Sequence, residues 1–127
     1  MKNQIEKTYV IDADIDLVWD ALTLVDEIGA WGAGPAVMTA RAGQPFSLWG
    51  GDIHGKNTEV VAPTLLKQDW YSDDWKEPSK VEFHLINNDY QTKIKLIQNG
   101  VPPDEKEEIA VSWDDYYIGA IKSYLES

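Results

Sequence analysis

The chain has 127 residues, the size of one ordinary domain, and we expect residues 1–127 to form a single domain around one hydrophobic core. Its net charge of −11 comes from 22 acidic and 11 basic residues, which argues against nucleic acid and anionic membrane surfaces as partners. The absence of cysteine excludes disulfides, thiolate nucleophiles and cysteine-ligated metals. No apolar run approaches the roughly 18 residues of a membrane span or resembles a signal peptide, so we expect a cytoplasmic protein.

A strand and two short helices are predicted at the N-terminus. Residues 4–12 alternate between two sets of side chains, which indicates a strand, although neither set is cleanly apolar. Asp14 stands before apolar residues that recur at helical spacing over 15–22, so we expect it to be the N-cap of a short helix. A second short helix is expected over residues 24–30 and should end near Gly32.

The middle of the chain, from Val37 to Gln98, shows the period-two hydrophobic pattern of strands, interrupted by short turns. This pattern predicts an antiparallel meander of about six strands with one buried and one solvated face. Phe83 belongs to the inward set of its strand, and Gln68 is a polar residue on the inward face of the strand before it.

The C-terminal segment after Pro103 predicts the longest helix of the chain. Acidic residues at 104–108 suit the positive end of the helix dipole, and Lys122 lies near the opposite end. The apolar stripe of this helix needs a large partner surface, and the inner face of the sheet is the candidate. We therefore predict an α+β fold: a curved antiparallel sheet of about six to seven strands, two short helices after the first strand, and a long C-terminal helix across the sheet. The stripe consists of Ile109, Trp113, Tyr116, Tyr117, Ala120, Ile121 and Tyr124.

Five fragments in this order and spacing carry a family resemblance over nearly the whole chain: "VWDALT" (18–23), "GQPFSLWGGDIHG" (43–55), "LLKQDW" (65–70), "TKIKLIQNGVP" (92–102) and "WDDYYIGAIKSYL" (113–125). They resemble the helix-grip superfamily, also called START-like, SRPBCC or Bet v 1-like, and within it the family related to the C-terminal domain of the activator of Hsp90 ATPase. The resemblance implies a cavity between the sheet and the last helix, which relatives use to bind apolar small molecules and, in distant branches, for cyclisation or condensation.

One departure from the family concerns the chaperone contact. The resemblance implies that the eukaryotic co-chaperones carry a separate N-terminal domain that makes a main contact with the middle segment of Hsp90. These 127 residues have no counterpart to that domain. We therefore expect that co-chaperone activity cannot simply be carried over.

Aromatic residues are the first candidates for a binding site. The predicted fold places five of the six tryptophans, Trp75 among them, around the cavity and its mouth, where they either line a pocket or fill the core. Asn57 and Gln68 are expected to be buried, so their amides either pair with each other or the backbone, or orient a ligand together with Thr92 and Tyr117. The predicted cavity residues are Trp31, Phe46, Trp49, Asn57, Gln68, Trp70, Phe83, Thr92, Trp113 and Tyr117.

The sequence predicts no catalytic residue, no metal site and no cofactor. His54 lies in "GGDIHG", a fragment with three glycines. No other residue stands at the spacing of a metal-ligand or nucleophile motif relative to it, so a structural or surface role is favoured. Asp12, Asp14 and Asp16 resemble the start of a calcium loop, which then lacks the required glycine and glutamate.

Three functional hypotheses therefore stand side by side. The first is a protein that binds an apolar or aromatic small molecule in its cavity. The second is a protein-interaction module, such as a chaperone regulator or a homodimer, and the third is a cyclase- or hydrolase-type enzyme. The fold alone does not choose among them.

Overall fold

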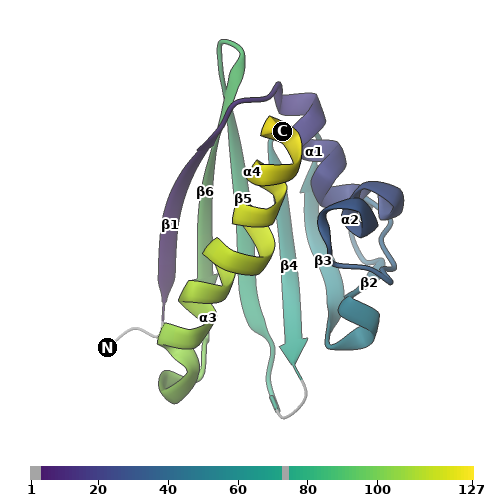
Figure 1. The fold of residues 1–127 in the computed structure, drawn as a ribbon. Coiled ribbons are helices and arrows are strands. Elements are labelled where there is room, and N and C mark those ends of the chain that lie inside the picture. Colours follow the sequence, from purple (N-terminus) through teal and green to yellow (C-terminus); the bar gives the residue numbers. More distant parts are fainter. Residues whose placement is uncertain (1–3, 73–74) are drawn as a thin grey trace.

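The computed structural model describes residues 4–72 and 75–127, and its main element is a six-stranded antiparallel sheet (Figure 1). Across the sheet the order is β1 (Ile5–Ile11), β6 (Gln91–Asn99), β5 (Ser79–Asn88), β4 (Leu65–Ser72), β3 (Ile53–Val61) and β2 (Pro45–Leu48). Strands β2 to β6 form a meander, while the N-terminal strand β1 pairs with the last strand β6 at one edge of the sheet.

The meander has five strands in the region where the sequence predicts about six. The segment that begins at Val37 contributes a single bridge to Ser47 and then turns instead of extending. The turn is closed by hydrogen bonds from Arg41 N to the Thr39 carbonyl and from Gln44 N to the Arg41 carbonyl. With β1, the complete sheet has six strands and agrees with the predicted fold.

Alternation along the strands separates the core from the solvent-exposed face, as predicted. Phe83 lies opposite Leu66 on one neighbouring strand and Leu96 on the other, and all three side chains have no exposed surface. Gln68 and Gln98 also point inward and are 1% and 0% exposed. Asn57, opposite Gln68 on β3, also has no exposed surface, so the inner face is apolar but includes three buried amides.

Two short helices follow β1, α1 (Ile15–Thr23) and α2 (Val25–Trp31), and α2 lies within one residue of its predicted bounds. Asp14 occupies the predicted N-cap position, but its side chain makes no capping hydrogen bond. The indole of Trp31 donates a hydrogen bond of 2.8 Å to the Ala21 carbonyl, which ties the two helices together. Gly32 ends α2 in the left-handed conformation, with φ of 117°.

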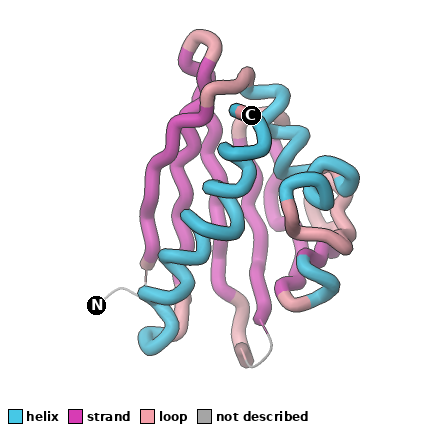
Figure 2. The backbone as a smooth tube through the Cα atoms, in the orientation of Figure 1, coloured by secondary structure: helices cyan, strands magenta, loops and turns pink. Residues whose placement is uncertain are grey.

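The C-terminal helix crosses the inner face of the sheet diagonally (Figures 1 and 2). It consists of α3 (Lys106–Ser112), a π-helical turn η3 (Trp113–Tyr117) and α4 (Ile118–Glu126). The sequence predicts a regular helix, and the π turn changes which side chains face inward: Trp113 and Tyr117 are buried, whereas Tyr116 from the predicted apolar stripe is 65% exposed. In the part of the chain that the structure describes, no helix is long and apolar enough to cross a membrane.

Candidate functional site

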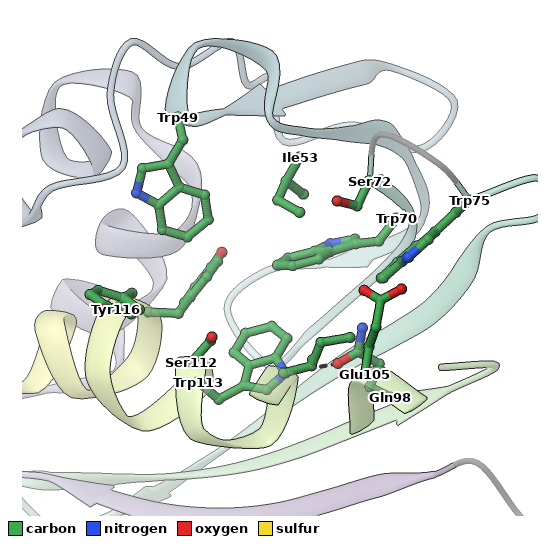
Figure 3. Close-up of a pocket in the computed structure, with 12 residues that line it drawn as sticks. Trp49, Ile53, Trp70, Ser72, Trp75, Gln98, Glu105, Ser112, Trp113 and Tyr116 are labelled. Atoms are coloured by element: carbon green, nitrogen blue, oxygen red, sulfur yellow. Dashed lines mark hydrogen bonds between the residues drawn. The ribbon is translucent and has the colours of Figure 1, made fainter. Parts of the chain in front are cut away.

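A pocket of about 350 Å³ lies between the ends of the central strands and the C-terminal helix (Figure 3). This volume lies within the range of roughly 300–1,000 Å³ that is typical of small-molecule sites. Its walls come from η1 (Trp49–Gly51), β3, β4, the segment after β4, β6, η2 (Pro103–Glu105) and the C-terminal helix. The lining residues are Trp49, Ile53, Trp70, Ser72, Trp75, Gln98, Glu105, Ile109, Ser112, Trp113, Tyr116 and Tyr117.

Tyr117 stands at the centre of an aromatic cluster behind this pocket. Its ring centroid is 4.8 Å from Trp113, 4.9 Å from Trp31 and 5.7 Å from Phe83. These separations are those of packed aromatic pairs. The tryptophans thus take both roles that the sequence left open, since Trp31 is packed in the core while Trp113 closes the core and also lines the pocket.

Two residues that line the pocket each have a buried polar atom without a hydrogen-bond partner among the described residues, namely Gln98 Nε2 and the Tyr117 hydroxyl. Gln98 has no exposed surface, and its Oε1 accepts a hydrogen bond of 2.8 Å from Trp113 Nε1. Tyr117 is 2% exposed, and its burial raises the pKa of the phenol well above the ordinary range. Unpartnered buried polar atoms cost about 1–3 kcal/mol each and are rare in folded proteins.

The amides of Asn57 and Gln68 are paired, in contrast to that of Gln98. Gln68 Nε2 donates to Asn57 Oδ1 over 2.9 Å, and Gln68 Oε1 accepts from Trp70 Nε1 over 2.7 Å. Asn57 Nδ2 donates to the carbonyls of Thr39 and Arg41 over 2.6 and 3.1 Å. Of the two arrangements that the sequence allowed, the structure therefore shows pairing with each other and the backbone, and this network holds the 39–41 turn against the sheet.

The predicted cavity residues divide into two groups. Trp49, Trp70, Trp113 and Tyr117 line the pocket together. The others lie outside its lining, either packed behind the aromatic wall or bonded elsewhere, as Thr92 is to the Ala13 carbonyl over 2.8 Å. This second group is Trp31, Phe46, Asn57, Gln68, Phe83 and Thr92.

Gln98 and Glu105 are the lining residues of most chemical interest that the sequence analysis missed. Gln98 continues the inward alternation of Thr92, Ile94 and Leu96, so the period-two pattern extended by one step would have found it. The acidic cluster was assigned to the helix dipole, but the 3-10 turn before α3 brings half-buried Glu105 into the lining (Figure 3).

Both histidines lie away from this pocket. His54 is exposed and stacks on Tyr71 with centroids 5.6 Å apart, while His84 Nε2 lies 2.7 Å from Glu82 Oε1. Gly55, next to His54, is required by close packing, because a Cβ there would overlap the carbonyl oxygen of Asp69. Within residues 4–72 and 75–127, no group of three or more His, Asp or Glu side chains could hold a metal ion.

Comparison with known proteins identifies the family. Residues 12–126 match the model of the family described as "Activator of Hsp90 ATPase homolog 1-like protein". The chain belongs to this family. Mouse "Activator of 90 kDa heat shock protein ATPase homolog 2" is 26% identical over 121 residues, which cover 94% of this chain and 37% of the mouse protein. The chain thus spans little more than a third of that relative.

Solved structures confirm the predicted helix-grip fold. The crystal structure of an HSP90 activator from Plasmodium falciparum has a TM-score of 0.87 and 25% identity, and the match covers 97% of this chain and 96% of that one. The Aha1 dimer from Colwellia psychrerythraea has a TM-score of 0.83, 18% identity, and coverage of 97% and 96%. At the latter identity the likeness shows the fold alone.

Proposed function

We propose that this chain binds an Hsp90-type chaperone and raises its ATPase activity. The observation that carries the proposal is the family match over residues 12–126, joined to a likeness that covers nearly the whole length of a chain described as an HSP90 activator. That second match supports the proposal, because it covers 96% of a chain that is described as an HSP90 activator.

The distribution of charge supports a protein partner at the helical side of the molecule. On the outer face of the sheet, lysines pair with acids: Lys67 with Glu59 at 3.4 Å and Lys95 with Glu6 at 3.1 Å. The helices carry eleven acidic residues and two lysines. We expect this acidic side to meet a basic surface of the chaperone, because complementary charge speeds association and fixes orientation.

The test is the ATPase rate of the source organism's Hsp90 homologue, titrated with this protein. We expect a saturable increase that weakens as salt is raised. The double variant Glu107→Lys/Glu108→Lys, on exposed positions of α3, should reduce the increase. Its matched control is Glu6→Lys/Glu59→Lys on the outer face of the sheet, which changes the net charge equally and removes only surface ion pairs of little energetic weight.

Two results would contradict this proposal. An ATPase rate unchanged at every concentration of the protein would remove the activator role. If the two double variants reduced the increase in ATPase rate equally, net charge and not the helical side would govern the contact.

A second candidate function is the binding of an apolar or aromatic small molecule, and the pocket favours it. Six of its twelve lining residues are aromatic, and the two unpartnered polar atoms belong to the lining residues Gln98 and Tyr117. Native and denaturing mass spectrometry of the purified protein tests this candidate. A mass excess that disappears on denaturation supports it, whereas no excess together with no thermal stabilisation by a panel of lipids and aromatic metabolites would exclude it.

A further inference from the structure

We infer that the pocket selects flat aromatic molecules that carry an uncharged hydrogen-bond acceptor, such as a ketone or amide carbonyl, and that it disfavours carboxylates. The inference rests on the proposed ligand-binding role and names the chemistry of the ligand. Three features of the lining carry it: the shape of its aromatic walls, the orientation of the Gln98 amide, and the sign of its charge.

The aromatic walls favour a flat ligand. Figure 3 shows Trp49 and Trp75 at opposite sides of the pocket, with Trp70 and Trp113 between them. The rings of Trp70 and Trp113 are 5.0 Å apart and inclined by 33°, and Trp113 is also packed against the buried Tyr117. Because these rings pack against one another, their positions are restrained before a ligand arrives. Fixed rings gain most from a planar partner that can stack on them.

The Gln98 amide can offer only a donor to the pocket. Trp113 Nε1 is a donor without acceptor capacity, so the atom that it contacts at 2.8 Å must be the amide oxygen. This contact fixes the amide orientation and leaves Nε2, which only donates, without a partner among the described residues. The Tyr117 hydroxyl is the second unpartnered group and can donate as well. A ligand that completes these hydrogen bonds must therefore present an acceptor.

Charge decides which kind of acceptor fits. Among the residues that the structure describes, Glu105 is the one charged side chain in the lining, and no Lys, Arg or His belongs to it. A bound carboxylate would lie near this like charge without a cation to balance it, in a protein of net charge −11. A neutral carbonyl accepts the same hydrogen bonds without this repulsion. The lining therefore separates ketones and amides from acids of the same shape.

Three naphthalenes of matched size test the inference: 2-acetylnaphthalene, 2-isopropylnaphthalene and 2-naphthoate. Their affinities for the ¹⁵N-labelled protein are measured at pH 7 from the shifts of the indole N–H signals. One hydrogen bond to a buried donor should make the ketone bind roughly five- to tenfold more tightly than the hydrocarbon. The naphthoate should bind most weakly of the three.

Two pairs of variants assign the selectivity to residues. Tyr117→Phe keeps the ring and removes the buried hydroxyl, so it should reduce the preference for the ketone over the hydrocarbon. Tyr90→Phe, on a residue that is 82% exposed and lies outside the lining, is the control and should leave that preference unchanged. Glu105→Gln should raise the affinity for naphthoate roughly threefold or more and leave the ketone unaffected. The same change at exposed Glu107, outside the lining, should alter neither affinity.

The outcomes separate the inference from the proposed function. Equal binding of ketone and hydrocarbon, with shifts at the pocket indoles, would overturn the acceptor selectivity and leave ligand binding standing. Naphthoate binding as tight as the ketone would overturn the charge selectivity. If none of the three probes binds and the broader ligand panel also fails, both the inference and the ligand-binding role are wrong, while the chaperone proposal is unaffected.

Discussion

Tyr117→Phe should stabilise the unliganded protein. The substitution keeps the ring that packs against Trp31, Phe83 and Trp113, so the aromatic cluster loses no contacts. It removes a hydroxyl that is buried without a partner among the described residues. Burial of such a group costs about 1–3 kcal/mol relative to water, and the newly vacant volume is small, so we expect a gain of about 1–2 kcal/mol in the free energy of unfolding.

Urea unfolding followed by tryptophan fluorescence measures this gain as a higher midpoint with an unchanged m-value. For a domain of this size, the gain corresponds to an increase of roughly 3–10 °C in Tm. Tyr116→Phe is the control, because exposed substitutions change stability by no more than about 0.5 kcal/mol. A loss of 1 kcal/mol or more from Tyr117→Phe would refute the reasoning, since it would show that the hydroxyl has a hydrogen-bond partner in the folded protein.

The remaining predictions concern two glycines, the hydrogen bond between Asn57 and Gln68, and the stability of the protein at alkaline pH. Gly119→Ala should destabilise the protein in urea, because a Cβ there would overlap a carbonyl oxygen of the π turn, whereas Gly29→Ala, with open space in α2, should stabilise it by about 0.5–1 kcal/mol. Asn57→Ala should cost about 2–3 kcal/mol in the same assay, because it leaves the Gln68 amide buried without its acceptor. Burial raises the pKa of Tyr117 above the unfolded value of about 10, so the protein loses stability as the pH rises above that value and the phenol ionises in the unfolded chain. Unfolding measured from pH 8 to 11 should show a smaller alkaline loss of stability in Tyr117→Phe, and an unchanged slope would refute the raised pKa.

The period-two pattern was a reliable guide to the sheet because each strand has one buried face. Phe83 and Gln68 lie inward as the alternation predicts, and the pattern depends only on local geometry. The segment after Val37 shows the limit of this reasoning. Its short alternation does not distinguish a strand from the turn that hydrogen bonds at 39–44 form in the folded protein.

Sequence reasoning was less successful at the candidate site, because the site depends on which polar atoms remain unpaired. Gln68 and Gln98 are both inward-facing glutamines, and each accepts a hydrogen bond from a tryptophan indole. Only the folded structure reveals that Asn57 lies opposite Gln68 and accepts from its Nε2, while Gln98 Nε2 has no such neighbour in the described chain. A single sequence contains no signal that separates these two environments.

The π turn explains why the C-terminal helix can close the core and line the pocket at once. Both Trp113 and Tyr117 are buried within this turn, and the turn depends on Gly119, since a side chain there would displace the Asp114 carbonyl. The Asp114 carboxylate is in turn held by Tyr9, at 2.6 Å, and by Lys7, at 2.9 Å. These contacts explain why Lys7 and Tyr9 lie on the inward face of β1, so that neither face of this strand is cleanly apolar in the sequence. They anchor the π turn to the edge of the sheet, so the placement of the pocket aromatics depends on residues more than a hundred positions away in the sequence.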